Sequence, residues 1–191
     1  MYVLIGCETS GEVRRAFRRS GHNAYSCDLL PSDDNSCYHI VDDVRNVMNS
    51  GHFELGIFHP TCTFMCNSGV SHLYKDIDRW KKLIDSAVLF RDILNCDIPK
   101  ICVENPIMHK YAVKIVGRRQ DQVIQPWMFG HGETKATCLW LKGLPLLKPT
   151  DVVEGREQRL HKLPPSKDRW KIRSRTFPGI AKAMAEQWGC Q

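Results

Sequence analysis

Short apolar runs alternate with polar or amphipathic stretches along most of the chain. Each run has the length of a buried β-strand, is too short for a helix, and is closed by polar or turn-forming residues. The expected strands are Tyr2–Ile5, Ala24–Cys27, His39–Val41, Leu55–Phe58, Lys100–Val103 and Thr137–Leu141.

Three stretches have the spacing of amphipathic helices. Gly11–Ser20 places apolar residues on one side and arginines on the other. Asp76–Asn95 is the longest helical pattern, and Phe177–Trp188 has Pro178 near its start. Because strands and helices alternate, the pattern predicts an α/β fold, with a mostly parallel sheet covered by helices on both faces.

Length and composition are those of an ordinary globular domain. The chain has 191 residues, of which 42% are hydrophobic and 25% charged, so a single domain is expected. No apolar run approaches the ~20 residues of a membrane span, and the start lacks the pattern of a signal peptide. The nine cysteines are odd in number and irregularly spaced. We therefore expect reduced thiols in a cytoplasmic protein.

The positive charge is concentrated near the C-terminus. The net charge is +6, and the segment Lys148–Arg175 holds nine Lys and Arg against four acids. Such a segment favours a polyanionic partner such as DNA, although a solvated basic tail fits equally well. Within it, an aromatic residue lies among cations, which suits a single strand or a flipped base: Arg169, Trp170, Arg173 and Arg175.

Polar residues gather where the expected strands end, which is where parallel sheets bind ligands. The turn after the first strand is built partly from small residues, and acids follow the next two strands. An acid such as Asp28 can accept the hydroxyls of a ribose, and Asp43 can accept from an adenine amino group. Either acid alone is also typical of a turn or a helix cap. The expected cofactor contacts are Cys7, Glu8, Ser10, Gly11, Asp28, Asp43 and Pro60.

Cys62 and Glu104 follow two successive strands and form a candidate catalytic pair. Cys62 comes near a possible helix start, which would lower its pKa and favour nucleophilic attack. If the two strands are neighbours, Glu104 lies beside the thiol and can exchange a proton or a hydrogen bond with a substrate.

These residues resemble the DNA cytosine-5 methyltransferases, whose signatures include Pro-Cys after the fourth strand and Glu-Asn-Val after the fifth. The matching segments here are Pro60-Thr61-Cys62 and Glu104-Asn105-Pro106. The segment 129–137, before the last strand, runs parallel to a later signature of the family. The chain also resembles small phage-encoded proteins described as methyltransferase-like. The resemblance implies a Rossmann-like methyltransferase fold that uses S-adenosylmethionine.

The resemblance also implies a mechanism. Cys62 would add to C6 of cytosine, and Glu104 would protonate or hydrogen-bond N3 and the amino group. C5 would then take the methyl group, and loss of its proton would release the cysteine. Asn105 would hold the loop, and Lys135 stands where the family places an arginine on O2. A base in duplex DNA would have to be flipped out.

The chain departs from the family in three places. The first loop lacks paired glycines, Thr61 separates proline from cysteine, and Thr137 replaces a second arginine. The expected division is a catalytic region (1–143), a basic linker or reduced recognition region (144–176) and a closing helix (177–191). So short a recognition region implies weak sequence reading, or a protein partner that supplies specificity.

Three alternatives remain open. The donors His59, Cys62, Cys66 and His72 could bind zinc, which would make Cys62 a ligand. An amino-group methyltransferase fits less well, because the segment after the fourth strand lacks that chemistry's polar and aromatic residues. The chain could also be an inactive binder of nucleic acid, nucleotide or a host protein. If it is active, the substrate could be a free cytosine nucleotide.

Overall fold

The computed structural model describes residues 1–190. Within them, one seven-stranded sheet has the order β3-β2-β1-β4-β5-β7-β6. Only β7 runs against the others, pairing antiparallel with β5 and with β6. The strands are β1 (Tyr2–Gly6), β2 (Asn23–Asp28), β3 (His39–Val41), β4 (Leu55–Phe58), β5 (Lys100–Asn105), β6 (Gln122–Ile124) and β7 (Thr137–Lys142).

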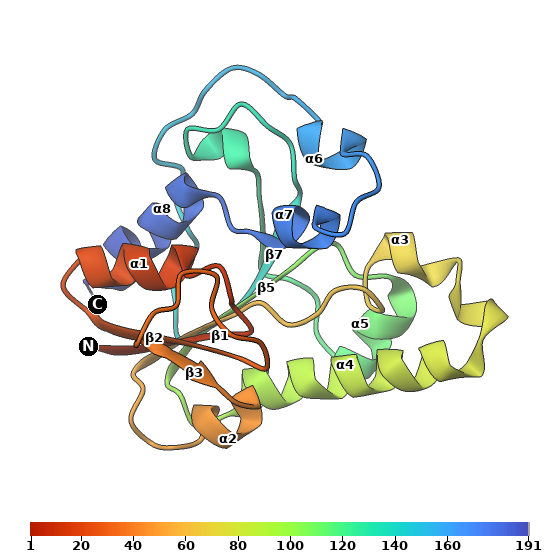
Figure 1. Cartoon of the computed structure of the whole chain (residues 1–191), viewed down its shortest axis with the longest axis horizontal. Helices are drawn as coiled ribbons and strands as arrows, with labels where there is room; N and C mark the ends of the chain where they lie inside the picture. Colours follow the sequence, from red (N-terminus) through yellow and green to blue (C-terminus); the bar gives the residue numbers. More distant parts are fainter. Residues whose placement is uncertain (191) are drawn as a thin grey trace.

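Helices cover both faces of the sheet (Figure 1). On one face, α1 (Glu12–Arg19) and α8 (Pro178–Trp188) pack on each other and on the strands. On the other face lie α2 (Val44–Met48), α4 (Ile77–Asn95) and α5 (Lys110–Val116). Each face has its own core of buried apolar side chains, because alternate strand residues point to opposite faces. Val3 and Ile5 belong to one core, and Leu4 belongs to the other.

The predicted α/β class is confirmed, and all six expected strands and three expected helices are present. The elements that were not predicted are short, because a few residues cannot show a helical or alternating period. They include β6, α2 and α5, the short helices α3 (Asn67–Val70), α6 (Arg159–Lys162) and α7 (Arg169–Ser174), and the 3₁₀ turns Leu73–Lys75 and Pro126–Met128.

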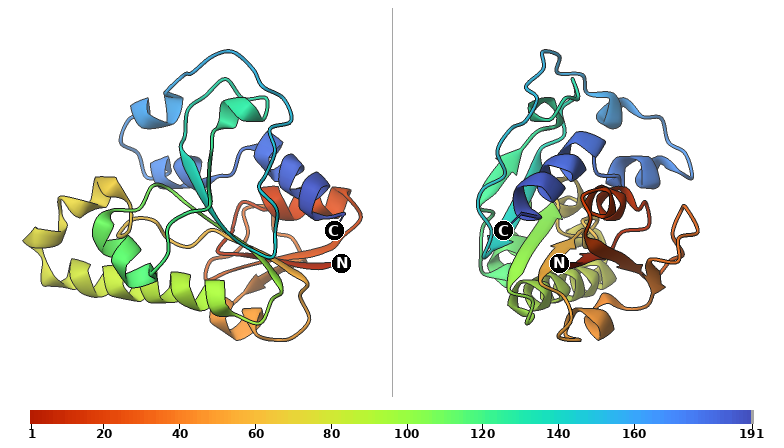
Figure 2. Two further views of the ribbon diagram at one scale, coloured as in Figure 1. Left: turned by 180° about the vertical axis from the view of Figure 1, so that it is seen from behind. Right: turned by 90° about the vertical axis from the view of Figure 1, so that its left-hand side faces the viewer.

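The segment between β7 and α8 does not extend into solvent as a tail. It rises above the sheet and returns through α6 and α7 to the strand ends, on the same side of the molecule as the loop after β2 (Figure 2). Across residues 1–190, no helix has the length and apolar character needed to cross a membrane.

Candidate active site at the strand ends

The carboxyl ends of β1, β2, β4 and β5 meet at one edge of the sheet, where most of the sequence-predicted site residues lie. β4 lies between β1 and β5, and all three run parallel. The backbone N–H of His59 continues this ladder by donating to the Gly6 carbonyl at 2.9 Å. The segment after β4 therefore lies between the candidate cofactor loop and Glu104.

A buried ion pair joins the segments that follow β4 and β5. The Nδ1 atom of His59 lies 3.0 Å from Oε2 of Glu104, and the two side chains are 13% and 9% exposed. The hydroxyl of Thr176 donates to the same Glu104 oxygen at 3.3 Å. Asn105 donates from its side chain to the Pro60 carbonyl at 2.9 Å, which fixes the loop before Cys62.

Burial by itself would raise the pKa of Glu104, but the hydrogen bond and charge of His59, the charge of Lys135 and the Thr176 hydroxyl lower it to about 2. For His59, burial opposes the charged form, yet Glu104 and the more distant Glu8 raise its pKa above the usual value. Each side chain therefore favours the charged form of the other. The other ring nitrogen of His59, Nε2, is buried without a hydrogen-bond partner among the described residues.

Cys62 and Cys66 form a hydrogen-bonded dithiol at the start of α3. The hydrogen bond to Cys66 and burial raise the pKa of the Cys62 thiol well above its usual value. The pKa of Cys66 falls to about 5, because the Cys62 thiol, the Ser68 hydroxyl (3.1 Å) and backbone N–H groups stabilise its thiolate. The lowered pKa that the sequence predicts at Cys62 is therefore found at Cys66, one helical turn further on.

Lys135 completes the group of expected catalytic residues. Its ammonium donates to the Arg175 carbonyl at 3.2 Å, and its charge lowers the pKa of both Glu104 and Cys62. Cys62, Glu104 and Lys135 therefore lie within electrostatic reach of one another.

Two residues of this group have roles that the sequence does not predict. The sequence pattern indicates His59 only as a zinc donor, although its position at a strand end is a usable signal. Thr176 gives no signal, because it reaches Glu104 across 72 positions of sequence.

The zinc alternative finds no support in the geometry. Among residues 1–190, no three His, Cys, Asp or Glu side chains form a group that could hold a metal ion. His59 instead pairs with Glu104, and the thiols of Cys62 and Cys66 are hydrogen-bonded to each other.

On the cofactor side, the Glu8 side chain caps helix α1. Its Oε1 atom accepts from the Val13 backbone at 2.9 Å and from the Ser10 hydroxyl at 3.1 Å, while Oε2 accepts from the Arg14 backbone at 3.5 Å. Gly11 precedes the helix with φ of 67°, and a Cβ there would meet the guanidinium of Arg14 at 2.4 Å. A carboxylate of the chain therefore occupies the helix start, where the sequence predicts that Ser10 and Gly11 contact a cofactor.

Three further cofactor candidates lie close together at the ends of β1, β2 and β3. Burial and the charges of Asp28, Cys27 and Asp43 raise the pKa of the Cys7 thiol to about 12. Asp28 also accepts from the Leu30 backbone, and Asp43 caps α2 by accepting from the Arg45 backbone, each at 3.0 Å. Both acids therefore also have the turn and cap roles that the sequence left open.

The basic segment borders a cleft of about 670 Å³ beside the β1–α1 turn. Arg175 pairs with Asp33 at 3.0 Å, and Lys171 lies 3.8 Å from the same carboxylate. Trp170 is 55% exposed. The cleft is lined by Thr9, Leu30, Pro31, Ser32, Asp33, Asp168, Lys171, Ile172 and Arg175.

The other two basic candidates do not take part in that ion pair. Arg169 donates to the His161 carbonyl at 3.4 Å, and Arg173 is exposed. α7 is thus a wall of the candidate site.

No family model matches the sequence, and no curated protein matches it. Among solved structures, the methyltransferase EhMeth of Entamoeba histolytica superposes with a TM-score of 0.51 at 18% identity, covering 83% of this chain and 57% of that one. A candidate DNA modification methyltransferase encoded within an E. coli prophage gives 0.49 at 12% identity, covering 81% and 52%. S. pombe Dnmt2 methyltransferase gives 0.45 at 14% identity, covering 76% and 50%.

The chain therefore spans only about half the length of these proteins. At such low identity the similarity concerns the fold. The observed sheet and the match to EhMeth identify the fold as the Rossmann-like fold of S-adenosylmethionine-dependent methyltransferases, as the sequence predicted.

Proposed function

We propose that this protein transfers a methyl group from S-adenosylmethionine to C5 of cytosine, in DNA, through a covalent adduct with Cys62. The observation that carries the proposal is the convergence of Cys62, the His59–Glu104 pair and Lys135 at the strand ends of a methyltransferase fold. A thiol, a carboxylate and a cation are the groups that nucleophilic addition to a pyrimidine requires.

The cofactor would lie against the ends of β1 and β2, and when bound it supplies an electrophilic methyl group. The adjacent cleft of about 670 Å³ falls within the range of roughly 300–1,000 Å³ that is usual for small-molecule sites. Asp28 would accept the ribose hydroxyls and Asp43 the adenine amino group, with Cys7 between them. Pro60 would close the side that faces the base.

The dithiol provides the nucleophile with a base. The two hydrogen-bonded thiols share one ionisation, and the lower pKa of Cys66 makes transfer of the Cys62 proton to the Cys66 sulfur uphill. The transfer would therefore have to accompany bonding of the Cys62 sulfur to C6. The C5–C6 double-bond electrons move onto the ring, where Lys135 stabilises the charge that develops at O2. C5 would then be placed to accept the methyl group that the bound cofactor supplies, with the cofactor's thioether as the leaving group. Loss of the C5 proton to solvent water would let the C6–sulfur bond break and restore the ring. The departing Cys62 thiolate would take its proton back from the Cys66 thiol.

Glu104 enters this scheme as a carboxylate. Its pKa of about 2 means that at neutral pH it accepts a hydrogen bond from the cytosine amino group but has no proton of its own for N3. The nearest proton is the one on Nδ1 of His59, a nitrogen that lies 3.0 Å from Oε2 of Glu104. His59 is therefore a positioning residue, which orients Glu104 and keeps it charged.

The test is to express the wild type, Cys62→Ala and Cys37→Ala in cells without other cytosine methylation. Cys37 is exposed and lies outside the site, so its variant is the matched control. DNA and the nucleotide pool are digested separately, and modified cytosine is measured by mass spectrometry. We expect 5-methylcytosine in the DNA of the wild type and the control only.

Other results would contradict defined parts of the proposal. Methylation that survives in Cys62→Ala excludes this nucleophile. A product found only in the nucleotide pool makes a free cytosine nucleotide the substrate. The absence of modified cytosine from every fraction would contradict the methyl-transfer activity itself.

One observation favours a second candidate, an inactive binding protein. Helix starts bind anionic groups of ligands, and here Glu8 places a carboxylate of the chain at the start of α1. Calorimetric titration with S-adenosylmethionine distinguishes the two candidates, because a methyltransferase binds the cofactor and an inactive binder has no need to.

A further inference from the structure

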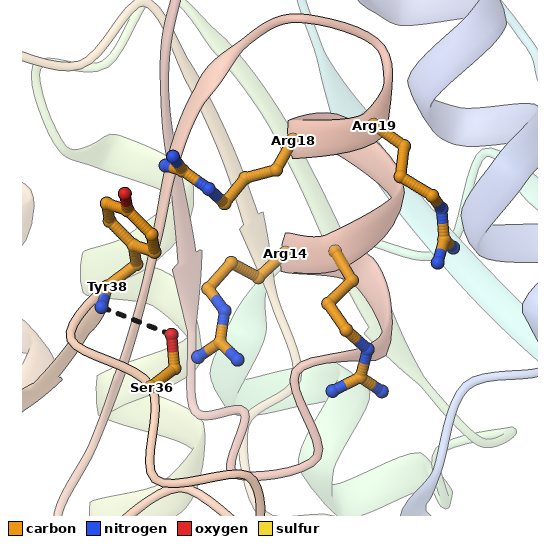
Figure 3. A pocket seen from close by; sticks show the side chains of 6 residues that line it. Arg14, Arg18, Arg19, Ser36 and Tyr38 are labelled. Atoms are coloured by element: carbon orange, nitrogen blue, oxygen red, sulfur yellow. Dashed lines mark hydrogen bonds between the residues drawn. The ribbon is translucent and has the colours of Figure 1, made fainter.

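A second hollow lies away from the strand ends, and each side chain that lines it carries at least one hydrogen-bond donor. It has a volume of about 360 Å³ and lies between helix α1 and the segment that leads into β3. Figure 3 shows arginine side chains extending from α1 beside Ser36 and Tyr38. Its lining residues are Arg14, Arg15, Arg18, Arg19, Ser36 and Tyr38.

Two of the four arginines build the wall of the hollow. Arg14 is 1% exposed and donates to the Ser26 hydroxyl at 2.7 Å and to the Asp34 carboxylate. Arg15 donates to the same carboxylate at 2.7 Å and pairs with Glu12 at 2.8 Å. Burial would raise the pKa of Asp34, but the two guanidinium groups lower it to about 2. These contacts hold the loop that carries Asp34 against α1. The carboxylates of Asp34 and Glu12 compensate the charges of Arg14 and Arg15.

The other two arginines keep hydrogen-bond donors available. The guanidinium of Arg18 stacks on the Tyr38 ring, 3.3 Å from its centroid. Stacking fixes the plane of the guanidinium, and its N–H donors stay in that plane. Within residues 1–190, their one hydrogen bond is to the Ala24 carbonyl, at 3.4 Å. Arg19 is exposed and pairs with no acid in residues 1–190. The Ser36 hydroxyl also faces the hollow.

The net positive charge around the hollow favours an anionic ligand. Four guanidinium groups face two carboxylates, those of Asp34 and Glu12, which leaves two positive charges uncompensated. A planar guanidinium matches phosphate oxygens in geometry as well as in charge. Tyr38 is 37% exposed and meets Tyr25 edge to face at 5.9 Å, so a partly exposed aromatic side chain, with Arg18 over one face of its ring, adjoins the hollow.

We infer that this hollow binds a backbone phosphate of single-stranded nucleic acid, with Arg18 as the principal ligand. Arg19, which extends to the other side of α1 (Figure 3), would contact an adjacent phosphate. The inference is independent of methyl transfer, since it involves none of the residues at the strand ends. The nucleic acid would then contact α1 as well as the basic segment Lys148–Arg175. The loop that carries Asp33 and Asp34 lies between these two surfaces.

The test measures binding of a fluorescently labelled single-stranded oligonucleotide by anisotropy at several salt concentrations. The variant is Arg18→Gln/Arg19→Gln. The matched control is Lys114→Gln/Arg119→Gln, which removes the same charge from two exposed positions in and just after α5. Neither side chain forms an ion pair within residues 1–190, although the neighbouring Arg118 pairs with Asp121. We expect about tenfold weaker binding for the variant, and a salt slope smaller by about 0.7 for each phosphate that the variant no longer binds. The control should bind within twofold of the wild type.

Three results would overturn the inference. Equal losses in both double variants would mean that binding follows net charge alone. Unchanged binding in Arg18→Gln/Arg19→Gln would exclude the hollow as a site, once circular dichroism shows the variant folded. If a cytidine monophosphate competes as strongly as the oligonucleotide does, the ligand is a free nucleotide.

Discussion

The two halves of the strand-end edge use their polar residues differently. At the ends of β4 and β5, side chains from distant parts of the chain bind one another: His59 pairs with Glu104, and Thr176 donates to the same carboxylate. At the ends of β1, β2 and β3, carboxylates bind the backbone of their own segment, as Glu8 does at the start of α1 and Asp43 does at α2.

This difference distinguishes side chains suited to catalysis from side chains that stabilise a single helix or turn. A buried charge that pairs with a distant side chain requires that several elements assemble correctly, and its loss affects both reactivity and stability. A carboxylate that caps a helix stabilises a single element and can do so without any ligand. The β4–β5 side therefore carries the stronger argument for catalysis, and the cofactor side is where the proposed function is most open to test.

The largest expected effect comes from breaking the buried pair. Glu104→Gln leaves the His59 ring without its counter-charge, and removing one partner of a buried ion pair costs about 3–5 kcal/mol. Chemical denaturation at pH 6 should show this loss in the free energy of unfolding. Asp78→Asn, which breaks an exposed pair with Lys81, is the control and should cost less than about 1 kcal/mol. A loss no larger than that of the control would show that the pair contributes little.

The same pair predicts how stability depends on pH. The pKa of Glu104 is lowered from 4.5 to about 2, so its contribution is complete above pH 4.5 and falls as the pH drops toward 2. The pKa of His59 is raised above 6.5, so its contribution is complete below pH 6.5 and falls as the pH rises through the raised value. The contribution of the pair to the free energy of unfolding of the wild type should therefore be greatest between pH 4.5 and 6.5. Glu104→Gln should lose this peak.

A smaller effect is expected on the cofactor side from Glu8→Ala. The substitution removes the acceptor for the Val13 and Arg14 backbone N–H groups at the buried start of α1. Leaving a buried donor unsatisfied costs roughly 1–3 kcal/mol, so thermal unfolding should shift by several degrees. If Glu8 only caps the helix, cofactor binding by the folded variant will equal that of the wild type. Tighter cofactor binding would mean that the carboxylate of Glu8 repels the anionic end of the cofactor.

Cys66→Ser tests whether the dithiol acts as a unit. The serine hydroxyl does not ionise near neutral pH, so Cys62 loses its proposed base while it keeps a neighbour of similar size. We expect methyl transfer to slow by at least tenfold and to recover partly as the pH rises, because hydroxide then deprotonates Cys62. Single-turnover transfer of a labelled methyl group measures this rate. A rate and pH profile equal to those of the wild type would contradict a role for Cys66.

The sequence predicted the strand ends well because apolar runs and the residues that close them are local features. Cys62, Glu104 and Asn105 could be placed at one edge, since parallel strands end together. Their partners could not be predicted. The Thr176–Glu104 contact joins positions 72 residues apart. The pKa values of Cys62 and Cys66 depend first on the hydrogen bond between the two thiols, and then on burial and on backbone N–H groups.

The smallest expected effect distinguishes a cap from a cofactor ligand at Asp43. Its carboxylate accepts from the Arg45 backbone at 3.0 Å, and replacing such a cap by alanine costs about 1 kcal/mol. The amide that Asp43→Asn introduces would cap the helix nearly as well, but it carries no negative charge. If Asp43 also binds the adenine amino group, Asp43→Asn will keep its unfolding temperature and lose affinity for S-adenosylmethionine in calorimetry. If both quantities stay at their wild-type values while Asp43→Ala loses stability, Asp43 is a cap alone, and the cofactor side has one ligand fewer than the resemblance implied.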